Sequence, residues 1–130
     1  MKVVSVASCR HGEYAVIAAA MERLTEVPPE SGAVICLGLR LEDFPVEAWA
    51  GLYEFLRSPA GSVWLSDEEL ERARRYLHCA DGVRHLLGRS LLRRALGRWS
   101  GKALPAAWPL NAWGKPEPWA DFHFNISHAG

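Results

Sequence analysis

The stretch from Ser66 to Gly101 constrains the fold most, because it contains two helix starts and one helix end. Ser66 is followed three positions later by Glu69, which is the pattern of a capping box. Asp81 can cap a second helix, and Gly101 stands where a helix terminator is expected. We therefore predict helices over 66–79 and 82–99. Their expected buried stripes are Leu70, Ala73, Tyr76 and Leu77 in the first helix, and Val83, Leu86, Leu87, Ser90, Leu91, Arg94 or Ala95, and Trp99 in the second.

Shorter elements surround these two helices. Apolar runs over 3–7 and 33–39 favour strands, and apolar residues at helical spacing favour a helix over 13–24. Pro45 can open another helix, whose apolar face reaches Leu56. Residues 103–121 are rich in Pro and Trp and predict an ordered loop, whereas 122–127 alternate between apolar and polar side chains, as in a half-buried strand. We expect one α+β domain, in which two or three strands pack against the helices.

The composition narrows the class of protein. Fifteen basic residues balance fifteen acidic ones, so no net charge draws the chain to nucleic acid or to a membrane. Three widely spaced cysteines suggest neither a disulfide framework nor a CxxC metal site, and we expect reduced thiols in the cytoplasm. No apolar run approaches the ~20 residues of a membrane span.

A basic cluster is the first candidate for chemistry. Eight arginines lie between Arg72 and Arg98, where Asp81 is the single acid. The planar guanidinium group suits phosphate oxygens. Composition alone favours a solvated face whose arginines pair with acids such as Asp67 and Glu68.

Two further segments could contact a ligand. Trp113-Gly114-Lys115-Pro116 places a cation on a tight turn, which is a weak signal by itself. Phe124-Asn125-Ile126-Ser127-His128 places a hydroxyl group and an imidazole at the end of a strand, where histidine can meet a phosphate. The five histidines show no spacing typical of metal ligands.

Gly88 in the second long helix predicts a close approach of another backbone.

Three motifs in register resemble a known family. Leu65 to Glu69, Arg72 to Tyr76 with His78, and Arg84 to Arg89 resemble the first signature of 4′-phosphopantetheinyl transferases of the surfactin-synthetase-activating type. Gly114-Lys115-Pro116 resembles the second, and residues 124–130 resemble the third. The match covers 65–130, about half of the chain. It implies a half-domain over 33–130 with a small antiparallel sheet packed on helices, preceded by a poorly matched extension over 1–32.

The resemblance also implies a binding site. Family members are pseudo-dimers that hold coenzyme A, the substrate, between two similar halves. Carried over position by position, Arg72 and His85 would meet its 3′-phosphate region with Arg84 close by, Gly114, Lys115 and Pro116 would border the adenine, and Ser127 and His128 would reach the phosphates. We expect Arg72, His85, Lys115 and His128 to converge on one concave surface. Two positions depart from the family, since Glu69 replaces a frequent basic residue and His85 a common hydroxyl residue.

The family's catalytic motifs are missing from this chain. Its Gly-Ile-Asp-x-Glu motif, which holds Mg²⁺, and its Trp-x-x-Lys-Glu motif, which supplies a base, do not occur here. We therefore expect no catalytic residue or metal ligand in this chain, and little activity by the chain alone. A strand at the very end of the chain, with no partner after it, is unusual for a complete domain.

Several alternatives stay open. The chain could be truncated, it could be one subunit of a split enzyme, or it could be a non-catalytic module that binds coenzyme A or another phosphate ligand. Expected partners are an apo acyl or peptidyl carrier protein and either a separate carboxyl-terminal half or a second copy. A small helical protein that binds nucleic acid through its arginines is a further alternative, which the neutral net charge opposes.

Overall fold

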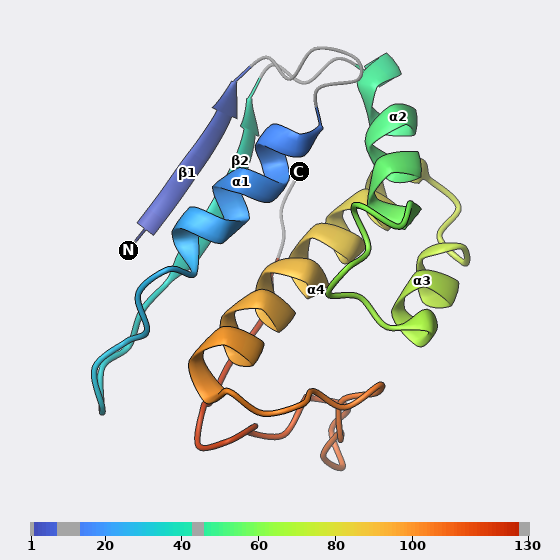
Figure 1. Cartoon of the computed structure of the whole chain (residues 1–130). Coiled ribbons are helices and arrows are strands. Elements are labelled where there is room, and N and C mark those ends of the chain that lie inside the picture. Colours follow the sequence, from blue (N-terminus) through green and yellow to red (C-terminus); the bar gives the residue numbers. More distant parts are fainter. Residues whose placement is uncertain (1, 8–13, 43–45, 128–130) are drawn as a thin grey trace.

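The structure, a computed structural model, describes residues 2–7, 14–42 and 46–127. These residues form a small helix-rich domain with two strands, which is compatible with the predicted α+β class (Figure 1). In chain order the elements are β1 (Lys2–Ala7), α1 (Ala15–Leu24), β2 (Leu37–Glu42), α2 (Val46–Arg57), α3 (Asp67–Ala73) and α4 (Cys79–Ser100).

The two strands pair in parallel, from Lys2 opposite Leu37 to Ala7 opposite Glu42. The expectation of an antiparallel sheet is wrong for this pair, because α1 carries the chain back between the strands so that both run in the same direction. The strand predicted over 33–39 begins later, at Leu37, where pairing with β1 begins, and Val34 is 97% exposed.

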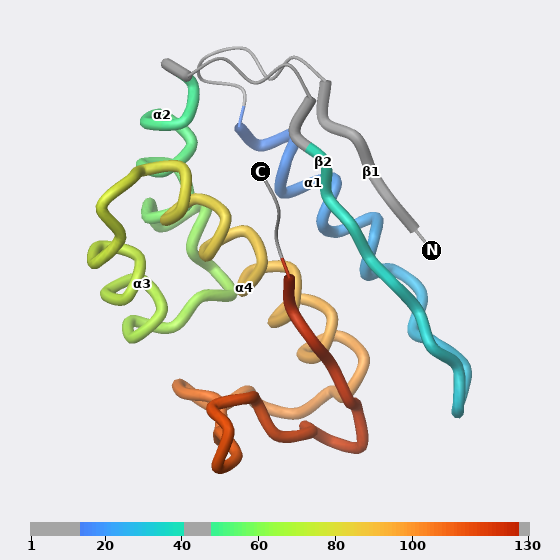
Figure 2. Tube along the Cα trace, turned by 180° about the vertical axis from the view of Figure 1, so that it is seen from behind, coloured from blue at the N-terminus to red at the C-terminus, as the bar shows by residue number. Residues whose placement is uncertain are grey.

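Helix α4 is the central element of the fold. In both views α1 lies on one side of it, and α2 and α3 lie on the other (Figures 1 and 2). The predicted inner face is confirmed, since Val83 and Leu86 are fully buried and pack with Ile17 of α1 and Leu52 of α2. Because β1 and α1 belong to this packed unit, much of 1–32 is integral to it; the family boundary at residue 33 stays a prediction.

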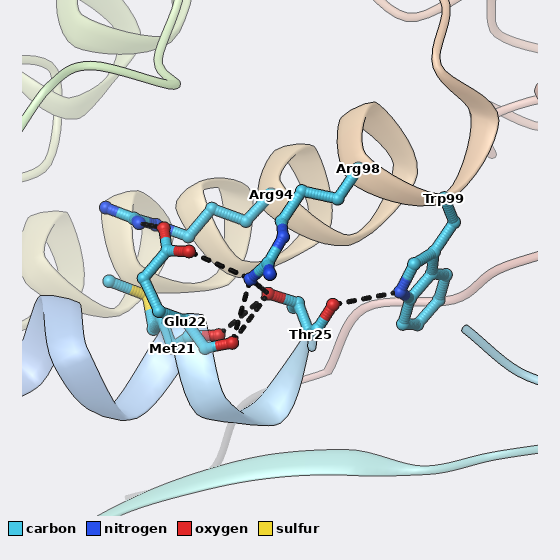
Figure 3. A network of polar contacts seen from close by, with 6 residues as sticks. All are labelled: Met21, Glu22, Thr25, Arg94, Arg98 and Trp99. Carbon is cyan, nitrogen blue, oxygen red and sulfur yellow. Dashed lines mark hydrogen bonds and ion pairs between the residues drawn. The ribbon is translucent and has the colours of Figure 1, made fainter. Parts of the chain in front are cut away.

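A polar network joins the end of α1 to the last turns of α4 (Figure 3). Arg94 and Arg98 both pair with the Glu22 carboxylate. Arg98 also donates to the Thr25 hydroxyl at 3.0 Å, and the Trp99 indole donates to the Thr25 carbonyl at 3.1 Å. These contacts explain why two arginines occupy the inner side of α4, since both serve to anchor α1.

Helix α3 is shorter than predicted. It ends at Ala73, so Leu77 is 91% exposed and Tyr76 is 38% exposed instead of buried. The start of α4 packs against this end of α3, where a Cβ on Gly82 would lie 3.2 Å from the Ala73 carbonyl oxygen. A continued α3 would occupy that space, and the chain turns over 74–78 instead.

The last described segment, 122–127, is not a strand. The predicted alternation is confirmed, because Phe122, Phe124 and Ile126 are half-buried while the residues between them are exposed. Its single backbone bridge joins Phe122 to Trp119. Figure 2 shows the segment running beside α4, and a Cβ on Gly88 would lie 3.2 Å from Ile126 Cγ2. The close approach at Gly88 is therefore made by a side chain, not by the backbone that we predicted.

Candidate anion-binding site

Arg93 holds together the three segments that form the candidate site. Its side chain is 96% buried, and it pairs with the Glu69 carboxylate of α3. The same guanidinium donates to the carbonyl oxygens of Pro105 at 2.7 Å and Ala106 at 3.0 Å, and it lies over the Trp108 ring at 5.1 Å. One buried cation on α4 thus draws both α3 and the segment after α4 against that helix.

A capping box fixes the start of α3 and so positions Glu69 for its contact with Arg93. Ser66 Oγ accepts from the Glu69 amide at 3.2 Å, and the Glu69 carboxylate accepts from the Ser66 amide at 3.0 Å. The predicted capping box is confirmed. Glu69 therefore has a structural role at the start of α3.

A pocket of about 560 Å³ lies between α3, α4 and the segment 106–110. Four basic side chains line it: Arg72, Arg75, His85 and Arg89. Its other lining residues are Asp67, Glu68, Glu69, Glu71, Ala106, Ala107, Trp108 and Leu110. The pocket is thus a mixed-charge cleft in which cations from two helices face one another.

The pocket arginines differ from the rest of the basic cluster in their partners. Five of the eight pair with carboxylates, namely Arg74 with Glu71, Arg84 with Asp81, Arg93 with Glu69, and Arg94 and Arg98 with Glu22. Within the described residues, Arg72, Arg75 and Arg89 form no ion pair. The expected solvated face thus applies to part of the cluster, but the predicted pairing with Asp67 and Glu68 is absent among these contacts.

The acids of the pocket do not cancel these cations directly. Glu69 is paired with Arg93, and Glu71 with Arg74 at 3.8 Å. Asp67 and Glu68 are exposed in the first turn of α3, where acidic side chains stabilise a helix N-terminus. Among the described residues, Arg72, Arg75 and Arg89 thus line the cleft without a carboxylate at ion-pair distance, although the charge of Glu69 still acts on Arg89.

Three buried polar atoms of the lining have no hydrogen-bond partner among the described residues: Glu69 Oε2, His85 Nε2 and Trp108 Nε1. His85 is 8% exposed, and its Nε2 has no hydrogen-bond partner in the described part of the chain. Trp108 is likewise 8% exposed, and its Nε1–H is unpartnered in the same sense. A buried donor or acceptor without a partner costs about 1–3 kcal/mol, so a ligand that supplied partners here would gain affinity.

Burial and the neighbouring charges of the pocket lower the pKa of His85. Burial lowers this pKa from the usual 6.5, Arg89 and Arg72 lower it further, and Glu69 opposes the shift. Burial also lowers the pKa of Arg89, Glu69 opposes this shift, and the charges of Arg72 and Arg93 add to it. Arginine nevertheless stays charged at neutral pH. The free pocket therefore holds like charges close together and disfavours a further proton on the imidazole.

No family model, no curated protein and no solved structure matches this chain.

The structure brings together two of the residues singled out by sequence. Arg72 and His85 both line the pocket, from different helices. Arg84 does not, because it turns to Asp81 at 3.1 Å and lies over the Trp49 ring at 5.4 Å. The expectation that Arg84 sits close to the ligand phosphate is therefore unsupported by its contacts.

The second motif lies beside the pocket and not in its wall. Gly114 has φ +78° in a turn held by Asn111, whose side chain accepts from the Lys115 amide at 3.0 Å. Pro116 forms a bridge with Leu110, which does line the pocket. Lys115 is exposed and outside the lining, so the expected convergence with Arg72 and His85 is not seen for its side chain.

The third motif is described in part. Ser127 is exposed and follows Ile126, which packs on α4 at Gly88, one turn after His85. His128 lies outside the described residues. The predicted role of this segment at the ligand phosphates stays a prediction.

Sequence reasoning missed Arg75, Arg89, Arg93 and Trp108 as individual site residues. A signal for two of them was present, because His85, Arg89 and Arg93 follow one another at intervals of four and so share one face of α4. Polar residues at that spacing on a largely buried helix indicate that this face contacts other polar or charged groups. Trp108 gave no comparable signal, since its position depends on Arg93 and on Phe124, whose ring lies 5.4 Å away.

Among the described residues, no three His, Cys, Asp or Glu side chains are grouped so as to hold a metal ion. In the same residues, no helix combines the length and apolar character needed to cross a membrane.

Proposed function

We propose that this chain supplies the coenzyme A-binding wall of a 4′-phosphopantetheinyl transferase. That reaction moves phosphopantetheine from coenzyme A to a serine of an acyl or peptidyl carrier protein. One observation carries the proposal. Arg72 and His85, which the resemblance assigns to the 3′-phosphate region, line one pocket although they belong to different helices.

The charges of the pocket support the same ligand. Arg72, Arg75 and Arg89 have no carboxylate partner among the described residues, and guanidinium groups bind phosphate oxygens through paired N–H donors. His85 and Trp108 add polar groups that lack partners in the wall. The 3′-phosphate of coenzyme A is a compact dianion that would use both features.

The reaction assigns a limited role to these residues. The serine oxygen bonds to the phosphorus of the pantetheine phosphate, the pyrophosphate P–O bond breaks, and adenosine 3′,5′-bisphosphate leaves. The serine proton needs a base, and the motif that supplies it in the family is absent from this sequence. The role of this chain is therefore to bind and orient the nucleotide, and cytoplasmic action on a carrier protein is part of the proposal.

Isothermal titration of the full chain with coenzyme A and with dephospho-coenzyme A tests this role. We expect weak binding of coenzyme A, and binding of dephospho-coenzyme A weaker by at least about tenfold, because charge-assisted hydrogen bonds contribute about 1.5–3 kcal/mol. Arg72→Ala should abolish the difference. Arg74→Ala is the matched control, since Arg74 is exposed at the end of the same helix and pairs with Glu71. Equal affinities for both ligands in the unmodified chain would contradict the proposal.

A binding module without catalysis is the second candidate, and one observation favours it. The pocket is lined by α3, the turn after it, α4 and 106–110 of this chain, so anion binding does not need a second half. Incubation with coenzyme A, Mg²⁺ and an apo carrier protein, followed by mass spectrometry of the carrier, separates the candidates. We expect almost no transfer by this chain alone and transfer only when a carboxyl-terminal half is supplied.

A further inference from the structure

The pocket lining places a titratable ring beside guanidinium groups, and this arrangement has a consequence beyond nucleotide binding. His85 and Arg89 lie one turn apart on α4, and Arg72 faces them from α3. The resemblance assigns no role to Arg89, and at the position of His85 the family commonly has a hydroxyl residue, which does not titrate. This chain therefore combines an extra guanidinium group with a titratable ring in one wall.

We propose that the pocket binds a phosphate monoester as its dianion, that Arg89 holds the anion together with Arg72, and that His85 takes up one proton from solvent as the anion enters. The identity of the ligand as a phosphate monoester rests on the proposed function. The linkage between anion and proton rests on the geometry of this wall alone.

The His85 ring is buried in the pocket wall. His85 is 92% buried, so its ring has lost most contact with water, and its Nε2 is unpartnered among the described residues. A neutral ring whose Nε2 is not satisfied gains a hydrogen bond if that atom becomes protonated and donates to an anion. The charged form is stable at this depth only if an opposite charge arrives with the proton.

The charged groups around the His85 ring determine in which direction its pKa is shifted. From α3 these are Glu69 and Arg72, from α4 Arg89, and after α3 the Tyr76 ring lies 5.6 Å from the imidazole. The remaining charged residues of the lining are Asp67, Glu68, Glu71 and Arg75, while 106–110 contributes no titratable side chain. Burial and the two arginines hold the pKa of His85 down in the free chain. A dianion that neutralises Arg72 and Arg89 removes part of that repulsion and adds an attraction, so the pKa of His85 rises on binding.

Reciprocity then makes anion affinity depend on pH. If anion binding raises the proton affinity of His85, protonation raises the anion affinity by the same factor. For one linked proton, the affinity can rise by at most about tenfold for each unit that the pH falls. An anion that stays doubly charged would be held more tightly on the acidic side of neutrality and released more readily above it.

Sulfate is a suitable probe, because it stays dianionic throughout the range where histidine titrates. We would titrate the full chain with sulfate between pH 5.5 and 8, and follow the His85 ring by NMR with and without sulfate. The expected results are an affinity that rises several-fold toward pH 5.5 and a His85 pKa that moves up when sulfate is present. Arg89→Ala should weaken binding by about ten- to hundredfold and reduce the shift in pKa. His123→Gln, at an exposed histidine outside the lining, should change neither result.

Parallel titrations with coenzyme A separate this inference from the proposed function. Binding of coenzyme A with an unmoved His85 pKa would overturn the proton linkage while leaving the proposed function standing. Binding of sulfate with the linkage, but no preference for coenzyme A over dephospho-coenzyme A, would support the linkage and contradict the proposed function. If His85→Gln fails to fold, the NMR pKa of the unmodified chain and the Arg89→Ala result still decide the question.

Discussion

The Glu69 carboxylate, which closes the capping box of α3, also pairs with the buried Arg93 of α4. One side chain thus fixes both where α3 begins and how it lies on the central helix. The side chains of Glu69 and Arg93 are only 9% and 4% exposed, so neither charge has water as an alternative partner. The pocket exists because this pair positions α3, and its loss should be felt both in stability and in ligand binding.

Replacing Glu69 tests this pair. Glu69→Ala removes the cap partner and leaves a buried guanidinium uncompensated, so we expect the free energy of unfolding to fall by about 3–5 kcal/mol in urea denaturation. Glu69→Gln keeps a capping-box acceptor and should cost less. Glu68→Ala, at the exposed neighbour, should cost at most about 1 kcal/mol. A Glu69→Ala protein no less stable than Glu68→Ala would refute the structural role given to Glu69.

A second prediction concerns Thr25, at the junction between α1 and α4. Thr25 is fully buried, and its hydroxyl donates to the Met21 carbonyl at 3.0 Å and accepts from Arg98. Thr25→Val keeps the shape and removes both hydroxyl hydrogen bonds, while the Met21 carbonyl keeps the Thr25 amide and Arg98 keeps Glu22, so we expect a loss of about 0.5–1.5 kcal/mol per hydrogen bond. Thr25→Ser keeps the hydroxyl and should retain the Arg98 contact. Equal losses from both variants would show that shape, and not the hydroxyl, stabilises this junction.

Replacing either of two glycines in α4 by alanine should change the stability of the protein by different amounts. At Gly97 a Cβ would collide with the ring of Trp64, so Gly97→Ala should destabilise the protein by about 1–3 kcal/mol. At Gly88 a Cβ would lie 3.2 Å from the end of Ile126, and the higher helix propensity of alanine, about 1 kcal/mol, should largely offset this contact. Thermal unfolding of both variants provides the comparison. A larger loss at Gly88 than at Gly97 would contradict the packing described for α4.

The pKa of His85 predicts how stability varies with pH. Because this pKa is lower in the folded chain than the usual 6.5, the unfolded chain binds more protons as the pH falls through 6.5. The free energy of unfolding should therefore rise with pH across this range and be diminished on the acidic side. In the absence of anions, His85→Gln should flatten the dependence between pH 5.5 and 7, whereas the exposed His123→Gln should leave it unchanged. An identical slope in all three proteins would rule out His85 as its source.

Much of the fold was accessible from periodicity. The inner face of α4 and the faces of α1 and α2 follow the spacing of apolar residues, and the capping box gave the start of α3. The end of α3 was not predictable in this way, because it depends on where Gly82 meets Ala73 across a turn. The strand predicted over 33–39 shifted for a similar reason, since its bounds depend on the register with β1.

The site was only partly accessible from sequence. Arginines at 72 to 98 could be counted, but which of them pair with acids depends on long-range contacts such as Arg93 with Glu69 and Arg98 with Glu22. The resemblance selected Arg72 and His85, which share the pocket, and also Arg84 and Lys115, which do not line it. The spacing placed Arg89 on one face of α4 with His85, but its place in the pocket depends on how α3 packs against α4.

A crystal structure of the chain with adenosine 3′,5′-bisphosphate would test the central claim most directly, because the claim is that two helices and the segment after them form one anion-binding wall. We predict electron density for a phosphate group between Arg72, His85 and Arg89. A nucleotide bound elsewhere, for example at the outer surface of α4 away from α3, with this pocket holding no phosphate, would contradict the account.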